Sequence, residues 1–122
     1  MGSKKVLVVD DSPVVRSFHM NILKAAGFQA DGASDGIEAL EKALSHDYDL
    51  ILCDINMPNM DGITFIKKYR EEEKETPIII ITTQEENIHR KKGYEAGVNL
   101  YIVKPVKPST LTLHIRMLLG GK

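Results

Sequence analysis

Three aspartates and one lysine of this sequence stand where apolar, strand-like runs end. They are Asp10 and Asp11 after KKVLVV, Asp54 after DLILC, and Lys104 after LYIV. Because ligands of open α/β sheets bind outside the carboxyl ends of the strands, a parallel sheet would bring these side chains to one edge. Clustered carboxylates repel one another unless a cation lies between them. The spacing therefore predicts a site for a metal ion and a phosphoryl group.

The adjacent pair Asp10 and Asp11 says little by itself, since a polar turn leaving a strand often contains two aspartates. Its position beside Asp54, at the end of a second inner strand, makes it informative. Hard carboxylate oxygens suit Mg²⁺, which takes one or two carboxylates together with phosphate oxygens and waters. We therefore expect Mg²⁺ as the cofactor.

The loop INMPNMDG follows Asp54. Pro58 removes a backbone donor and fixes a turn, while Asp61 and Gly62 open the next helix. An ordinary strand-terminal carboxylate needs no such loop, and the loop marks Asp54 as a functional residue.

Thr82 ends the run PIIIIT, and Lys104 ends the last strand-like run before Pro105. A threonine hydroxyl can donate a hydrogen bond to a phosphoryl oxygen, and a lysine ammonium neutralises another as a compact charge. Singly, Thr82 could cap a helix and Lys104 could be an exposed lysine before a turn. Together with the aspartates they complete a phosphoryl pocket.

Five short β-branched runs alternate with five amphipathic stretches of helical length. This alternation predicts an α/β fold, a three-layer doubly wound (βα)5 arrangement with a five-stranded parallel sheet. The polar second run suits a sheet edge, whereas the continuous apolar runs suit strands covered on both faces. The expected strands are Val6–Asp10, Gln29–Ala33, Leu50–Asp54, Ile78–Thr82 and Leu100–Val103.

Apolar residues at helical spacing predict which helix faces point inward. The inward residues expected for the first helix, after a Ser12 cap, are Val14, Phe18, Ile22 and Ala26, and those for the second are Ile37, Leu40 and Leu44. The segment from Glu85 to Ala96 is the weakest helix, because its apolar positions are sparse and Gly93 lies inside it. The basic run from His89 to Lys92 is expected to be a solvated helix face, and the four histidines are expected at the surface.

The length of 122 residues suits one domain spanning residues 1–122, and the net charge of -1 gives no reason to expect nucleic-acid binding. The apolar runs are far shorter than the ~20 residues of a membrane span. We expect a cytoplasmic protein without a membrane segment. Cys53, inside an apolar run, is expected to be a small buried hydrophobic residue.

With Asp10–Asp11, Asp54 before MPNMDG, Thr82 and Lys104–Pro105 in this order, the chain resembles the receiver domain of two-component response regulators. The resemblance covers essentially the whole sequence and implies the flavodoxin-like architecture of that family. It is strongest to stand-alone receivers of the chemotaxis CheY type, because the sequence stops after the fifth helix and Tyr101 matches that group's aromatic switch position.

The resemblance implies that Asp54 is phosphorylated by a histidine kinase. Asp10, Asp11, Asp54 and the backbone carbonyl of Asn56 would be the ligands of Mg²⁺. The protein would then be a phosphorelay switch that catalyses its own phosphorylation and dephosphorylation, and not a conventional turnover enzyme.

The resemblance also implies that Thr82 and Lys104 bind the phosphoryl oxygens and that the peptide bond before Pro105 is cis. Thr82 and Tyr101 would form the switch, altering the face made by the fourth helix, fifth strand and fifth helix. A downstream protein would bind that face. We expect a monomer that could dimerise on phosphorylation.

Two other classes form alternatives. A Mg²⁺-dependent phosphatase of the haloacid dehalogenase type also forms an aspartyl phosphate, but it would carry Asp-x-Asp after its first strand. A flavodoxin-like cofactor binder would carry a Ser-, Thr- and Gly-rich phosphate loop there. The sequence has DDSP at this position, which favours neither class.

Overall fold

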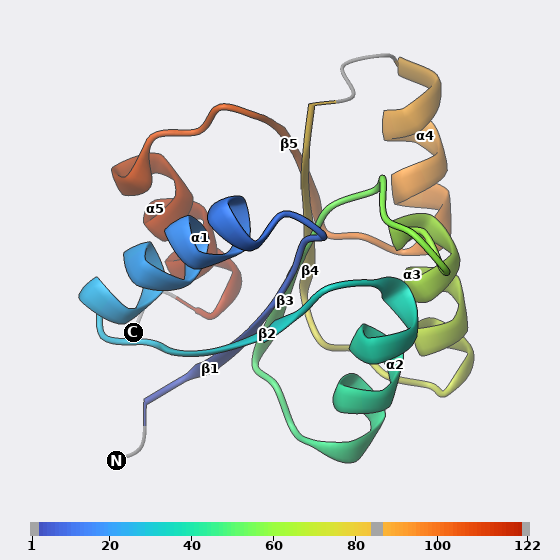
Figure 1. The fold of residues 1–122 in the computed structure, drawn as a ribbon, viewed down its shortest axis with the longest axis horizontal. Coiled ribbons are helices and arrows are strands. Elements are labelled where there is room, and N and C mark those ends of the chain that lie inside the picture. Colours follow the sequence, from blue (N-terminus) through green and yellow to red (C-terminus); the bar gives the residue numbers. More distant parts are fainter. Residues whose placement is uncertain (1–2, 84–86, 121–122) are drawn as a thin grey trace.

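The computed structural model describes residues 3–83 and 87–120, and Figure 1 shows a central sheet between two helical layers. All strand pairs are parallel, in the order β2-β1-β3-β4-β5. Helices α1 and α5 lie on one face, and α2, α3 and α4 lie on the other (Figure 1). The predicted doubly wound (βα)5 fold is confirmed, with the polar second strand at an edge. The elements are β1 (Lys5–Val9), α1 (Pro13–Ala25), β2 (Gln29–Ala33), α2 (Gly36–Ser45), β3 (Leu50–Cys53), α3 (Gly62–Glu71), β4 (Ile78–Thr82), α4 (Asn87–Ala96), β5 (Leu100–Val103) and α5 (Pro108–Leu118).

The central strands bury both of their faces, which explains their continuous apolar sequences. Leu7, Ile51 and Ile80 pack in one core with α2, α3 and α4. Val8 and Leu52, on the opposite face, pack in a second core with α1 and α5. The sheet is thus held from both sides, and its strand ends are fixed relative to one another. Cys53 is fully buried, as predicted.

Strands β1 and β3 end one residue earlier than the sequence predicted, so Asp10 and Asp54 lie just beyond them. Their backbones nevertheless continue the sheet pattern. The N–H of Asp10 donates to the Ala33 carbonyl at 3.1 Å, and the N–H of Asp54 donates to the Val9 carbonyl at 3.0 Å. Both residues are therefore anchored to the neighbouring strands by main-chain bonds.

Helix starts follow the predicted capping residues. The Ser12 hydroxyl accepts from the Val15 N–H at 3.3 Å, with Pro13 at the first helical position. Asp61 caps α3 by accepting from the N–H of Ile63. These caps satisfy backbone donors that have no partner inside the helix. The predicted beginning of the fourth helix, at Glu85, lies outside the described residues.

The predicted inward face of α1 is wrong at its first two positions. Val14 is 79% exposed and Phe18 is 53% exposed, whereas His19 and Leu23 are buried. The sheet-facing stripe runs one residue further around the helix, and a histidine within it concealed the pattern. The expectation that all four histidines lie at the surface is therefore also wrong for His19.

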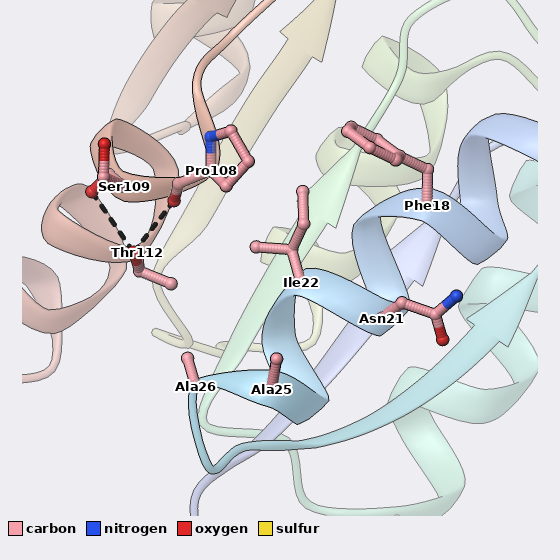
Figure 2. A pocket seen from close by; sticks show the side chains of 8 residues that line it. All are labelled: Phe18, Asn21, Ile22, Ala25, Ala26, Pro108, Ser109 and Thr112. Carbon is pink, nitrogen blue, oxygen red and sulfur yellow. Dashed lines mark hydrogen bonds between the residues drawn. The ribbon is translucent and has the colours of Figure 1, made fainter.

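The misassigned stripe of α1 lines a groove against α5. Figure 2 shows Phe18, Ile22 and Ala26 on the groove side of α1, with Pro108 and Thr112 of α5 opposite. The groove has a volume of about 460 Å³. Phe18 therefore lines the boundary between α1 and α5, whereas Ile22 lines this boundary and also packs against the core.

The second helix shows a related error. Ile37 and Leu44 are exposed, whereas Ala39 and Ala43 are buried, and Leu40 packs partly against the core as expected. Small side chains allow α2 to lie close to the sheet, and alanine carries little weight in a hydrophobic pattern.

No helix within residues 3–83 and 87–120 has the length and apolar character needed to cross a membrane.

Candidate metal and phosphoryl-transfer site

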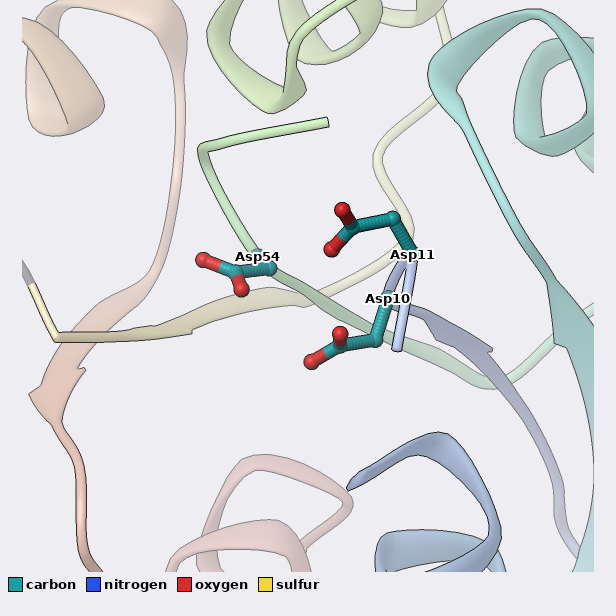
Figure 3. A group of neighbouring side chains, drawn as sticks. All are labelled: Asp10, Asp11 and Asp54. Atoms are coloured by element: carbon teal, nitrogen blue, oxygen red, sulfur yellow. The ribbon is translucent and has the colours of Figure 1, made fainter. Parts of the chain in front are cut away.

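Three carboxylates converge at the carboxyl edge of β1 and β3. Figure 3 shows Asp10, Asp11 and Asp54 directed toward a common space. Each offers an oxygen, and these oxygens all lie within 4.8 Å of one another. The cause is strand register: Val9 pairs with Cys53, so the residues that follow them, Asp10 and Asp54, end side by side. The first three predicted metal ligands are therefore brought together.

The buried aspartates are held by hydrogen bonds from residues that follow them in the chain. Asp10 Oδ1 accepts from the Ser12 N–H at 2.9 Å, and Arg16 Nη1 donates to the Asp10 carbonyl oxygen at 2.7 Å. Asp54 Oδ1 accepts from the Ile55 N–H at 2.7 Å. Asp10 and Asp54 are nearly inaccessible, while Asp11 is exposed. One oxygen of each buried carboxylate is thus fixed, and the other faces the shared space.

Lys104 reaches this space from the end of β5, across β4. Its Nζ lies 3.0 Å from Asp10 Oδ2 and 3.1 Å from Asp54 Oδ2. Burial alone would lower the pKa of Lys104, but its hydrogen bonds to both carboxylates and their charges outweigh burial and raise the pKa above its usual value. Lys104 is therefore a firmly charged ammonium. The peptide bond between Lys104 and Pro105 is cis.

Thr82 is fully buried at the end of β4. It pairs with Val103 in the sheet, and its carbonyl oxygen accepts from the Lys104 N–H at 2.7 Å. Thr82 therefore lies at the same sheet edge as Lys104. Asn56 lies exposed on the loop two residues after Asp54, and its part as a metal ligand stays a prediction.

The loop after Asp54 is closed by a bond between its two ends and is tied to the start of α2 by a side chain in its middle. The Gly62 N–H donates to the Ile55 carbonyl at 2.8 Å, and Asn59 Nδ2 donates to Asp35 Oδ2 at 2.7 Å. A Cβ atom at Gly62 would collide with the backbone carbonyl oxygen of Asp54. The sequence marked Gly62 only as a helix start; the structure shows that α3 begins in direct contact with the candidate phosphoacceptor's backbone, where only glycine fits.

Tyr101 is 4% exposed and packs in the core that contains α4. The guanidinium carbon of Arg90 lies 4.8 Å from the centre of the Tyr101 ring. Burial raises the pKa of the Tyr101 hydroxyl, and the charge of Arg90 opposes this rise. Arg90 was not predicted as a functional residue, because the basic run of α4 is typical of a solvated helix face. Only the packing of α4 on β5 reveals this contact.

His19 is a second residue that sequence reasoning missed. It lines a cavity of about 240 Å³ together with Val15, Phe18, Lys104, Pro105 and Val106. Its Nδ1 has no hydrogen-bond partner within residues 3–83 and 87–120. Burial and the nearby Lys104 lower the pKa of His19 below 6.5, while Asp10 and Asp54 oppose this shift. A neutral imidazole therefore lies behind the acidic site. No local signal distinguishes such a histidine from a surface one.

Known proteins share this arrangement over most of the chain. The sequence model of the response regulator receiver domain matches residues 6–116. The transcriptional regulatory protein ResD of Bacillus subtilis is 43% identical over 115 residues, which are 94% of this chain and 48% of ResD. SrrA of Staphylococcus aureus, also a transcriptional regulatory protein, is 40% identical over 117 residues, 96% of this chain and 48% of SrrA. The chain spans about half the length of these curated relatives.

Solved structures agree with the sequence comparisons. The chemotaxis protein CheY4 of Vibrio cholerae superposes with a TM-score of 0.90 at 37% identity, covering 96% of this chain and 99% of that protein. A CheY-like receiver domain protein of Methanospirillum hungatei gives a TM-score of 0.93 at 28% identity, covering 98% of this chain and 96% of that one. The matched residues, the fold and these relatives together show that this chain belongs to the response regulator receiver domain family of two-component systems.

Proposed function

We propose that Asp54 accepts a phosphoryl group from a histidine kinase in a Mg²⁺-dependent reaction and that the domain passes this state to a partner protein. The observation that carries the proposal is the Lys104 ammonium, which lies within 3.1 Å of both buried carboxylates, Asp10 and Asp54. In this site a nucleophile, a counter-charge and a set of metal ligands share one space. We take residues 1–122 as a single receiver domain.

The charge balance of the site suits a divalent cation. Asp10, Asp11 and Asp54 present three negative charges within 4.8 Å, and the Lys104 ammonium pairs with two of them. Mg²⁺ prefers carboxylate and carbonyl oxygens together with phosphate oxygens, and we expect the Asn56 carbonyl as the fourth protein ligand. When bound, the ion would supply charge neutralisation at the transferring phosphoryl group.

The residues of the chain would perform the transfer as an in-line displacement. The Ile55 N–H holds Asp54 Oδ1, and this leaves Oδ2 as the nucleophile. A bond forms between Oδ2 and phosphorus while the bond from phosphorus to the kinase imidazole nitrogen breaks, and the departing imidazole keeps that electron pair. Lys104 would move from the carboxylates to a phosphoryl oxygen, and Thr82 would donate to another. Positioning supplies most of the acceleration in such reactions.

The phosphorylated state would be transmitted from Asp54, at the end of β3, across β4 to the region around β5. Phosphorylation adds charge and three acceptor oxygens, and Thr82 would approach them, with Tyr101 packing behind it. This movement would alter the α4, β5 and α5 face, where the output protein binds. Water later hydrolyses the acyl phosphate, so the domain acts as a self-resetting switch.

We propose that this switch is a cytoplasmic monomer that dimerises when phosphorylated. The family match does not favour the phosphatase or flavodoxin-like alternatives.

Intact-mass measurement after incubation with acetyl phosphate tests the proposal. We expect the mass of one phosphoryl group to be gained with Mg²⁺ and not without it. Asp54→Asn should abolish this gain, because the amide is not a nucleophile. The matched control is Asp47→Asn, an exposed aspartate outside the site, which should behave as the native chain. Phosphorylation that persists in Asp54→Asn would refute the assignment of the phosphoacceptor.

A further inference from the structure

Arg90 of helix α4 lies close to both the ring and the backbone carbonyl of Tyr101. The Arg90 guanidinium carbon lies 4.8 Å from the ring centre, and Arg90 Nη1 lies 3.4 Å from the Tyr101 carbonyl oxygen, at the long limit for a hydrogen bond. A guanidinium within about 6 Å of an aromatic centroid is attracted by the negative face of the ring. Arg90 is partly buried, so water screens this attraction less than it would on an open surface.

Gly93, three residues after Arg90 and on the same side of α4, provides the space that this contact needs. A Cβ atom at Gly93 would lie 3.2 Å from Tyr101 Cδ2 and 3.0 Å from Ile80 Cδ1, tighter than ordinary van der Waals contact. The glycine lets α4 lie directly against the ring. Its position inside a helix, which costs up to about 1 kcal/mol relative to alanine, has a packing reason.

We propose that Arg90 is a positioning residue that holds Tyr101 in its buried orientation before phosphorylation. The arginine contacts the ring and lies next to the carbonyl of the same residue, so outward rotation of Tyr101 would break the ring contact. The consequence for signalling rests on the proposed function: the aromatic switch would begin from the inward orientation, and phosphorylation would act mainly on Thr82 and on α4.

The same arginine also faces the surface. Arg90 lines a shallow depression of about 540 Å³ with Lys91, Tyr94 and Glu95. A partner that draws the guanidinium toward this surface would weaken its hold on Tyr101. The structure therefore connects the orientation of a buried ring to one charged group on the outer side of α4.

Fluorine NMR of the 3-fluorotyrosine-labelled protein can test this role without phosphodonor or Mg²⁺. The chain has four tyrosines, and Tyr101→Phe identifies the Tyr101 signal. A soluble gadolinium chelate then reports how often the ring reaches solvent. Arg90→Gln should increase the relaxation enhancement of Tyr101 about fivefold, the change expected from losing one partly desolvated cation–π contact. The signals of Tyr48 and Tyr69, which do not line the depression beside Arg90, should not change.

The matched control is Lys91→Gln, which removes the same charge from an exposed neighbour and should leave Tyr101 unchanged. Arg90→Lys keeps the charge but loses the planar stacking; it should give a smaller increase, and it serves as the second measurement if Arg90→Gln folds poorly. Unchanged exposure of Tyr101 in the Arg90 variants, or an equal increase in Lys91→Gln, would overturn the proposal. Because no phosphoryl group is present, this result is independent of whether Asp54 accepts one.

Discussion

The acidic site and the Tyr101 region lie on strands of one sheet that are separated by β4, and they are held in different ways. Asp10 and Asp54 follow directly from paired strands, and backbone N–H groups fix one oxygen of each. Tyr101 lies within β5, yet its ring orientation depends on side-chain contact with Arg90 and on the space left by Gly93. One region is positioned by main-chain bonds and the other by exchangeable side-chain contacts.

This difference matches the two tasks of a signalling domain. The chemistry proposed for Asp54 would need reacting groups held to within a fraction of an ångström, which main-chain anchoring provides. A switch needs two arrangements of similar free energy, and side-chain contacts such as that between Arg90 and Tyr101 can be exchanged at lower cost than main-chain bonds. The same comparison predicts where substitutions do most damage. Changes that touch the backbone of the acidic site should have larger effects than changes around Tyr101.

The largest effect is expected for Gly62→Ala. The new Cβ would collide with the Asp54 carbonyl oxygen, a backbone atom that cannot move without displacing β3 or α3. Overpacking against a side chain costs about 1–3 kcal/mol, and a backbone collision should lie at or above the upper end of that range. We expect the free energy of unfolding, measured by urea titration, to fall by about 3 kcal/mol, and phosphorylation by acetyl phosphate to slow. Native stability in this variant would show that the loop yields and that the acidic site is less rigid than described.

A smaller effect, dependent on pH, is expected for His19→Leu. Burial and Lys104 lower the folded-state pKa of His19 below the ordinary 6.5, while Asp10 and Asp54 oppose the shift. Below about pH 6.5 the unfolded chain therefore binds a proton that the folded protein does not. The free energy of unfolding falls as the pH is lowered, until the pKa of the folded state is reached. The leucine variant should lack this loss, which is at most about 1.4 kcal/mol per pH unit. Urea unfolding at pH 7.5 and 5.5 measures it.

The control for His19→Leu is His46→Gln at an exposed position of the α2 end. This variant should keep the pH dependence of the native chain. An equal loss of stability on acidification in the native chain and in His19→Leu would show that other groups control it. The acidic site would then be insulated from the imidazole behind it.

The sequence predicted what depends on strands and missed what depends on helix packing. Asp54 and Lys104 could be placed because a strand end in a parallel sheet has a defined edge. His19 and Arg90 could not, because each lies on a helix whose rotation and approach to the sheet are set by tertiary contacts. Phe18 shows the same limit: its apolar stripe was real, but α5 and not the sheet lies beside it. Periodicity identifies an apolar face without naming its neighbour.

The smallest effect on stability is expected for Gly93→Ala, the counterpart of Gly62→Ala in the Tyr101 region. The added methyl group would press on Ile80 Cδ1 and Tyr101 Cδ2, which are side-chain atoms that can shift by a few tenths of an ångström. Alanine is favoured over glycine inside a helix by about 0.5–1 kcal/mol, and this gain offsets most of the overpacking. We expect the free energy of unfolding to stay within about 1 kcal/mol of the native value, while the Tyr101 fluorine signal moves. A loss as large as that in Gly62→Ala would mean that α4 is fixed against the sheet as firmly as the acidic site, and that the switch must move as one body with its helix.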